Sequence, residues 1–177
     1  SQGLFGALLL LAALYAAVPP SALGLGPAAF AVPTLATGAV AGVALYAGNE
    51  AVAVALRRAG VPVPETLRGL LAPDSRREWA ILLVGVLPIV AGFEELLFRG
   101  ALVGALSAGT PIPAWALAVA SSALFGLAHD AQGRPGVAVA ALLGLALAAL
   151  FVVTRSLPAV VVAHYVVNAL EFLVHER

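Results

Sequence analysis

The chain has 177 residues, of which 62% are hydrophobic and only 10% are charged, whereas a typical soluble domain is about 45–50% apolar and about 25% charged. A chain of this size cannot hide so much apolar surface in its own interior, so the composition excludes an ordinary soluble domain and indicates an integral membrane protein. The formal net charge is zero, which gives no electrostatic basis for binding nucleic acid, and the absence of cysteine excludes disulfides and thiolate chemistry.

Apolar runs separated by proline, glycine and arginine predict an all-α polytopic bundle of about six membrane-spanning helices. A span needs about 20 apolar residues. The predicted helices cover Leu4–Val18, Ala28–Leu56, Trp79–Leu106, Ala114–His129, Val137–Val153 and Leu157–Val174. The first run also has the length of a signal-peptide core, but it lacks a preceding positive segment, which favours a retained span. The third run is long, and Pro88 is placed to kink it.

The arginines predict the orientation of these helices. Five of them lie between the second and third helices, at Arg57, Arg58, Arg68, Arg76 and Arg77. The positive-inside rule makes this segment cytoplasmic and places both termini on the inside. Arg134 then falls in another inner loop, and Arg155 is the exception on the outside. Residues 61–79 contain a short amphipathic piece that we expect to lie on the membrane surface, and we expect the membrane to be a prokaryotic cell membrane.

Ionisable side chains inside the predicted spans are the main functional signal. Each costs about 2.5–3.5 kcal/mol on insertion scales, so its default interpretation is functional. Glu95 and Arg99 are four residues apart and share a helical face, as do His164 and Asn168. Glu94 is rotated by about 100° from Glu95, so the two carboxylates point in different directions. We expect one to pair with Arg99 and the other to be left for chemistry.

Depth in the membrane brings these residues together. At about 1.5 Å per residue, Glu94, His129 and Asn168 lie roughly 17–22 Å from the outer ends of three different helices, and His164 lies roughly 10 Å from one. This convergence predicts a functional site on the cytoplasmic side of the bilayer centre. Taken singly, each group also has a structural interpretation, as a buried ion pair, an interfacial histidine or an interhelical hydrogen bond. Other polar residues are predicted to be solvated or are assigned no role: Asp130, Arg134, His175, Glu176, Asn49 and Glu50.

Three short motifs carry a family resemblance. Glu94-Glu95-Leu-Leu-Phe-Arg99 matches EExxxR, Phe125-Gly-Leu-Ala-His129 matches FxxxH, and His164-Tyr-Val-Val-Asn168 matches HxxxN. In this order and at these separations, the chain resembles the CPBP family of intramembrane proteases, which includes the Rce1-type CAAX prenyl endopeptidases and the Abi bacteriocin self-immunity proteins. The resemblance implies a catalytic helical core in residues 79–177, preceded in residues 1–78 by transmembrane helices and the cytoplasmic loop, within one membrane domain.

The resemblance also implies roles for these residues. Glu94 and His129 would position and deprotonate a water, and His164 and Asn168 would stabilise the oxyanion. Three further residues would support them: Glu95, Arg99 and Phe125. Glu94, His129 and His164 also have the residue types of a His₂Glu zinc site. Because of such a set, the family is often classed with the metalloproteases. Between the two, we slightly favour a mechanism without an obligatory metal.

Three classes of function stay open at this point. The first is an intramembrane endopeptidase whose partners are membrane lipid and a membrane-associated peptide or protein substrate. The second is a non-enzymatic immunity or scaffold protein of the same fold, although a pure binder would be free to lose the costly buried charges. The third is an ion or proton transporter that uses Glu94, Glu95 and His164 as a relay. Short loops and the lack of repeats argue against the transporter. The sequence does not predict the oligomeric state.

Overall fold

The computed structural model describes residues 2–61, 69 and 71–176, and it contains helices and no strand in that part of the chain. Four helices there are long and apolar enough to cross a membrane, at Val32–Arg58, Arg76–Gly109, Asp130–Thr154 and Leu157–His175. Two shorter apolar helices accompany them, α1 (Gln2–Tyr15) and α7 (Ala114–Leu127). The predicted all-α membrane bundle is confirmed. Of the predicted surface segment at 61–79, residues 62–68 and 70 lie outside the described residues, and its last four residues, 76–79, belong to α4 (Arg76–Ala80).

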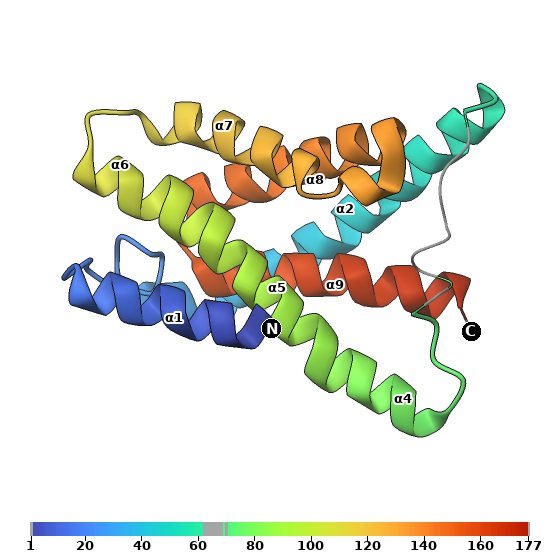
Figure 1. Cartoon of the computed structure of the whole chain (residues 1–177), viewed down its shortest axis with the longest axis horizontal. Coiled ribbons are helices and arrows are strands. Elements are labelled where there is room, and N and C mark those ends of the chain that lie inside the picture. Colours follow the sequence, from blue (N-terminus) through green and yellow to red (C-terminus); the bar gives the residue numbers. More distant parts are fainter. Residues whose placement is uncertain (1, 62–68, 70, 177) are drawn as a thin grey trace.

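The third predicted span is one continuous helical rod, drawn from green to yellow in Figure 1. It consists of α4 (Arg76–Ala80), η2 (Ile81–Val86), α5 (Leu87–Glu95), η3 (Leu96–Ala105) and α6 (Leu106–Gly109). The rod starts three residues earlier than predicted because Ser75 and Glu78 form a capping box, in which each side chain accepts a hydrogen bond from the other residue's backbone N–H. The polar residues at 75–78 therefore set the first turn.

Two segments of this rod are π-helical. The first, η2, ends just before Pro88, which has no N–H to donate to the preceding turn. At the kink predicted for Pro88, the structure has a widened, π-helical turn on the N-terminal side of the proline. The second, η3, begins directly after Glu95 and contains Arg99. π-helical turns are rare and frequently lie at functional sites, so the backbone is unusual at the EExxxR motif itself.

Several predicted helix ends shift for local reasons. The second helix, α2 (Val32–Arg58), follows a short 3₁₀ helix, η1 (Pro27–Phe30), instead of running on from Ala28. Pro33 sits in the first turn of α2, where a missing N–H costs little, so it marks a helix start. α7 ends at Leu127, before His129, and a 3₁₀ turn, η4 (Asp130–Gln132), leads into α8 (Gly133–Thr154).

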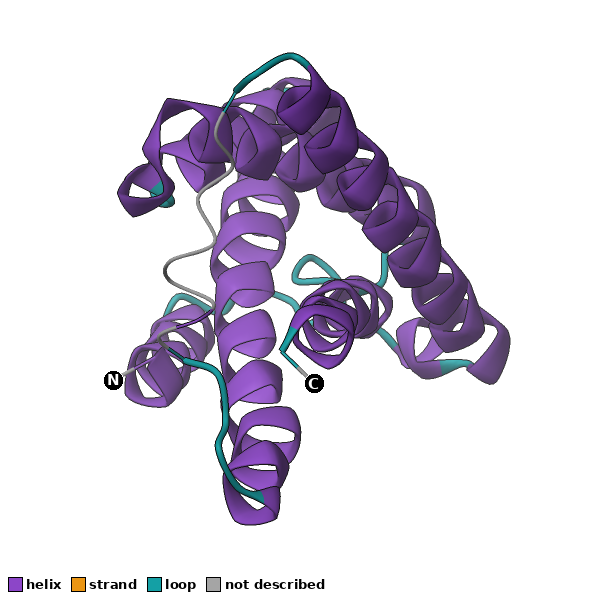
Figure 2. Cartoon of the chain, turned by 90° about the vertical axis from the view of Figure 1, so that its right-hand side faces the viewer, coloured by secondary structure: helices purple, strands orange, loops and turns teal. Residues whose placement is uncertain are grey.

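The last helix, α9 (Leu157–His175), organises the packing. It contacts α2, α5 and α8, while α7 lies along α8 on the other side of the bundle (Figures 1 and 2). α2 approaches α9 very closely through Gly38 and Gly42, because a Cβ at either position would collide with the carbonyl oxygens of Ala159 and Ala163. Such small residues four apart are a common means of bringing membrane helices together. The contact matters for function because it sets the spacing of two helices that line the pocket described below.

We expect Gly38→Ala and Gly48→Ala, two identical changes on α2, to have opposite effects on stability. Alanine favours a helix over glycine by about 1 kcal/mol, so Gly48→Ala, which meets nothing within 4 Å, should stabilise the protein slightly. Gly38→Ala should instead lower stability by about 1–3 kcal/mol, because its Cβ meets the α9 backbone. Thermal unfolding in detergent micelles measures both. A rise in the unfolding midpoint for Gly38→Ala would contradict the close α2–α9 contact.

Candidate active site

A pocket of about 450 Å³ lies between α2, α5, α8, α9 and the turn that follows α7. The four residues predicted to be catalytic line this pocket: Glu94, His129, His164 and Asn168. Each motif contributes at least one of them, from α5, from the turn after α7 and from α9. The structure thus brings the three motifs to one cavity, whose remaining wall is mostly apolar.

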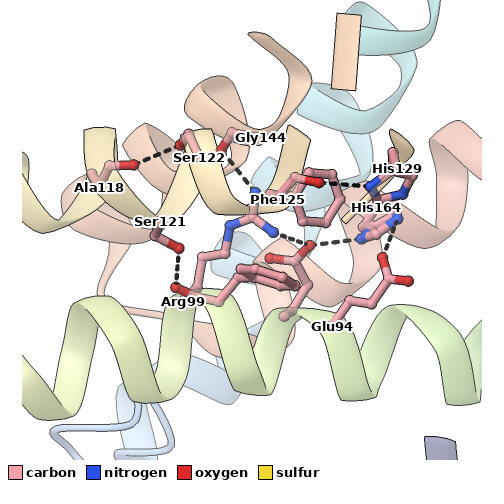
Figure 3. A network of polar contacts seen from close by, with 11 residues as sticks. Glu94, Arg99, Ala118, Ser121, Ser122, Phe125, His129, Gly144 and His164 are labelled. Carbon is pink, nitrogen blue, oxygen red and sulfur yellow. Dashed lines mark hydrogen bonds and ion pairs between the residues drawn. The ribbon is translucent and has the colours of Figure 1, made fainter. Parts of the chain in front are cut away.

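Arg99 and Glu95 form a fully buried ion pair beside this pocket. Arg99 Nη1 donates to Glu95 Oε1 at 2.8 Å, and Arg99 Nη2 donates to the Gly144 carbonyl oxygen at 2.8 Å. The guanidinium also lies 4.6 Å from the centroid of the Phe125 ring, within the range of a cation–π contact. Figure 3 shows Arg99 held between α8 and the carboxylate. The predicted pairing of Arg99 with one glutamate is present, and Phe125 supports it.

His164 connects the two glutamates. Its Nδ1 donates to Glu95 Oε1 at 2.6 Å, and its Nε2 lies 3.8 Å from Glu94 Oε2 (Figure 3). Because Glu95 Oε1 accepts from both Arg99 and His164, the chain of contacts from Arg99 to Glu95 fixes the orientation of the imidazole. The sequence predicted the pair within the helix but not the contact between Glu95 and His164, which belong to different helices.

The two glutamates differ in access to the pocket. The Glu94 side chain is 15% exposed and Glu95 is 0% exposed. Only Glu94 of the two lines the pocket. The adjacent carboxylates therefore have separate environments, as the rotation of about 100° between neighbouring helical positions requires.

His129 lies just outside α7 and not in its last turn as predicted. Its Nδ1 donates to the Phe125 carbonyl oxygen at 2.7 Å, and the two rings lie 4.6 Å apart. In a continuing helix, the backbone N–H of His129 would donate to the Phe125 carbonyl oxygen. Here the His129 side chain donates to that oxygen instead, so the helix can end without leaving the carbonyl unpaired. Since a carbonyl only accepts, Nδ1 carries the proton, and Nε2 is the basic nitrogen of the neutral ring.

A second polar group lies in the same pocket and was missed by the sequence-based interpretation. His175, predicted to be solvated, places Nε2 2.9 Å from Glu50 Oε1 and 3.8 Å from Glu171 Oε2. Asn49 and Glu50, which were assigned no role, also line the pocket. A usable signal was the spacing along α9, where His164, Asn168, Glu171 and His175 follow one another at intervals of four, three and four residues on one helical face.

The predicted zinc set does not fit a bound ion in this arrangement. Its donor types suit zinc, which takes nitrogen and oxygen ligands at about 2.0–2.2 Å. In the described part of the chain, however, the three-residue group whose ligand atoms all lie within 4.8 Å of one another is Glu50, Glu171 and His175, not Glu94, His129 and His164. We therefore derive no catalytic step through a metal at Glu94.

Comparison with known proteins identifies the family. The sequence model described as type II CAAX prenyl endopeptidase Rce1-like matches residues 76–170, more than half of the chain and all three motifs. No curated protein and no solved structure matches the chain. The matched segment begins at the first residue of α4 and includes Glu94, His129, His164 and Asn168. The chain therefore belongs to the type II CAAX prenyl endopeptidase Rce1-like family, a family of membrane proteases.

Proposed function

We propose that this protein hydrolyses a peptide bond of a membrane-associated substrate by means of a water activated at Glu94. One observation carries the proposal: Glu94 Oε2 lies 3.8 Å from His164 Nε2 on the wall of the pocket that His129 and Asn168 also line. That separation is too long for a direct hydrogen bond, and it leaves both groups within reach of one water in the pocket.

The choice between the two glutamates rests on access and on hydrogen bonding. A general base has to reach the proton that it removes. Glu94 is exposed to the pocket, whereas Glu95 is 0% exposed and its Oε1 already accepts from Arg99 and His164. Glu94 is therefore the proposed base, and the basic Nε2 of His129 is the second group that orients the water. Glu95 and Arg99 act as positioning residues that hold His164.

The oxyanion that forms during hydrolysis needs hydrogen-bond donors. The Asn168 side chain carries an amide N–H₂ one turn after His164 on α9. Donation from His164 Nε2 requires the doubly protonated ring, since Nδ1 donates to Glu95, and the carboxylates of Glu94 and Glu95 lie on either side of that ring as counter-charges. The two donors would then stabilise charge that develops on the substrate.

The substrate side of the proposal follows from the position of the site. Glu94 and His164 belong to helices long and apolar enough to span a membrane, so the substrate is a peptide or protein associated with the bilayer. From the positive-inside rule we infer that the pocket lies near the cytoplasmic face, and we propose that the membrane is a prokaryotic cell membrane. A proton relay through Glu94, His164 and Glu95 is less well supported, because the end of the relay at Glu95 is closed by Arg99, which is 0% exposed.

Removing His129 or Asn168 should lower cleavage of a membrane-tethered reporter peptide in liposomes. We expect His129→Ala to lower the rate by about 10²–10⁴-fold, the usual contribution of a general acid–base group. Asn168→Ala should lower it by about 10²–10³-fold, as for other oxyanion donors. Asp130→Ala, an exposed change in the same turn as His129, is the matched control and should cleave at nearly the wild-type rate. Cleavage at the wild-type rate in both variants would contradict the roles assigned to His129 and Asn168, and wild-type liposomes that take up protons but cleave no reporter would instead support the transporter.

A further inference from the structure

The three side chains Glu50, Glu171 and His175, which we call the α2–α9 cluster, form a group apart from the proposed catalytic residues. Glu50 comes from α2, and the other two come from the last turns of α9. All three line the pocket, and their side chains are 17–28% exposed, so an ion from solution can reach them. None of the three lies in the segment that the family model matches, residues 76–170. Membership of the family therefore does not account for them.

The geometry of the cluster suits a small divalent cation. Tetrahedral ligands at about 2.0–2.2 Å from zinc are separated from one another by about 3.3–3.6 Å. His175 Nε2 is 2.9 Å from Glu50 Oε1 and 3.8 Å from Glu171 Oε2, distances that bracket this value. One ligand atom from each residue lies within 4.8 Å of the other two. Small side-chain rotations are therefore enough to place all three around one ion.

The helices hold the ligands in a suitable arrangement. Glu171 and His175 are four residues apart on α9 and project from one face, and Glu50 faces them from α2. The Asn49 side-chain amide donates to Glu171 Oε1, which orients that carboxylate in the way that outer hydrogen bonds orient metal ligands. The close α2–α9 approach at Gly38 and Gly42 keeps the two helices at a set distance.

We propose that Glu50, Glu171 and His175 bind a divalent cation of the zinc class at a site separate from the catalytic residues. One imidazole and two carboxylates supply three ligands, and the pocket leaves a fourth position open to water. The ion would join α2 to α9 across the pocket. A loss of activity on addition of a chelator would then not by itself indicate a metal at Glu94.

Zinc binding to the purified full chain in detergent tests this proposal independently of catalysis. We expect wild type to bind Zn²⁺ in a calorimetric titration and to show a higher thermal unfolding midpoint with Zn²⁺. Glu171→Gln and His175→Ala should each weaken Zn²⁺ binding by more than about 10-fold, because even the loss of a residue that only hydrogen-bonds to a metal ligand can have an effect of that size. His129→Ala, which removes a histidine from the proposed catalytic set, is the matched control and should bind like wild type.

Two results would overturn the proposal. The first is a wild-type protein that binds no Zn²⁺ and whose unfolding midpoint does not respond to it. The second is binding that is lost in His129→Ala but kept in His175→Ala, which would move the ion to the catalytic set. Because binding is the readout, neither result depends on whether the protein cleaves the reporter.

Discussion

Replacing Glu94 by glutamine should lower the rate of peptide cleavage by about 10²–10⁴-fold while leaving the fold intact, since that range is the usual contribution of a general base. Glutamine has nearly the same shape as glutamate but no basic carboxylate. Glu94 is partly exposed to the pocket, and its contact with His164 is 3.8 Å long, so the exchange removes little stabilising interaction. Initial rates on a membrane-tethered reporter peptide in liposomes measure the effect, and thermal unfolding reports the fold.

Two comparisons make the Glu94 result specific. Asp74→Asn removes a carboxylate outside the pocket, from an exposed residue, and should retain the wild-type rate. Glu95→Gln should lower both the rate and the unfolding midpoint, because Glu95 is buried and holds Arg99 and His164. If Glu94→Gln cleaves normally and Glu95→Gln is inactive but fully stable, the roles assigned to the two glutamates are exchanged.

Replacing Arg99 by methionine should destabilise the protein by about 3–5 kcal/mol, the cost of leaving one partner of a buried ion pair alone. Arg99 is 0% exposed, and its two donated hydrogen bonds go to Glu95 and to the Gly144 carbonyl oxygen. Without it, the Glu95 carboxylate has only His164 beside it in an apolar surrounding. Thermal or denaturant unfolding in micelles should show the loss, together with a lower yield of folded protein.

The double variant Arg99→Met with Glu95→Gln is the informative control. Replacing both charged partners removes the unpaired carboxylate, so the double variant should be more stable than Arg99→Met alone. Its cleavage rate should stay low, because His164 then lacks the Glu95 carboxylate that orients it. A double variant less stable than Arg99→Met alone would contradict the expectation that the unpaired Glu95 carboxylate causes the loss.

Much of the fold could be predicted from the lengths of the apolar runs and from the proline, glycine and arginine residues that separate them. Long apolar runs predicted the helices because bilayer thickness and helix rise set the length of a span. The run Leu157–Val174 matches α9 within one residue, whereas the predicted starts at Ala28 and Val137 each miss the observed start by four residues. Two further errors were at helix ends that side-chain hydrogen bonds decide. Ser75 with Glu78 extends the rod by a capping box, and the His129 imidazole ends α7 by taking the Phe125 carbonyl oxygen. The π-helical segment after Glu95 had no signal in the apolar pattern.

The candidate site was predictable to the extent that its residues lie four apart on one helix. The Glu95–Arg99 pair and the shared face of His164 and Asn168 both follow from helical spacing. The Glu95–His164 contact does not, because it depends on how α5 and α9 pack against each other. The α2–α9 cluster was missed for a similar reason, because the contact between Glu50 and His175 depends on how α2 packs against α9. The helical spacing of the polar residues His164, Asn168, Glu171 and His175 was visible in the sequence alone.

The origin of the oxygen in the product is the most direct test of an activated water at Glu94. Wild type in liposomes would be given a membrane-tethered peptide in water labelled with oxygen-18, and the products would be analysed by mass spectrometry. We predict a cut peptide whose new carboxylate carries the label, and no such product from Glu94→Gln over the same period. A labelled product formed by Glu94→Gln at the wild-type rate would contradict the assignment of Glu94 as the base.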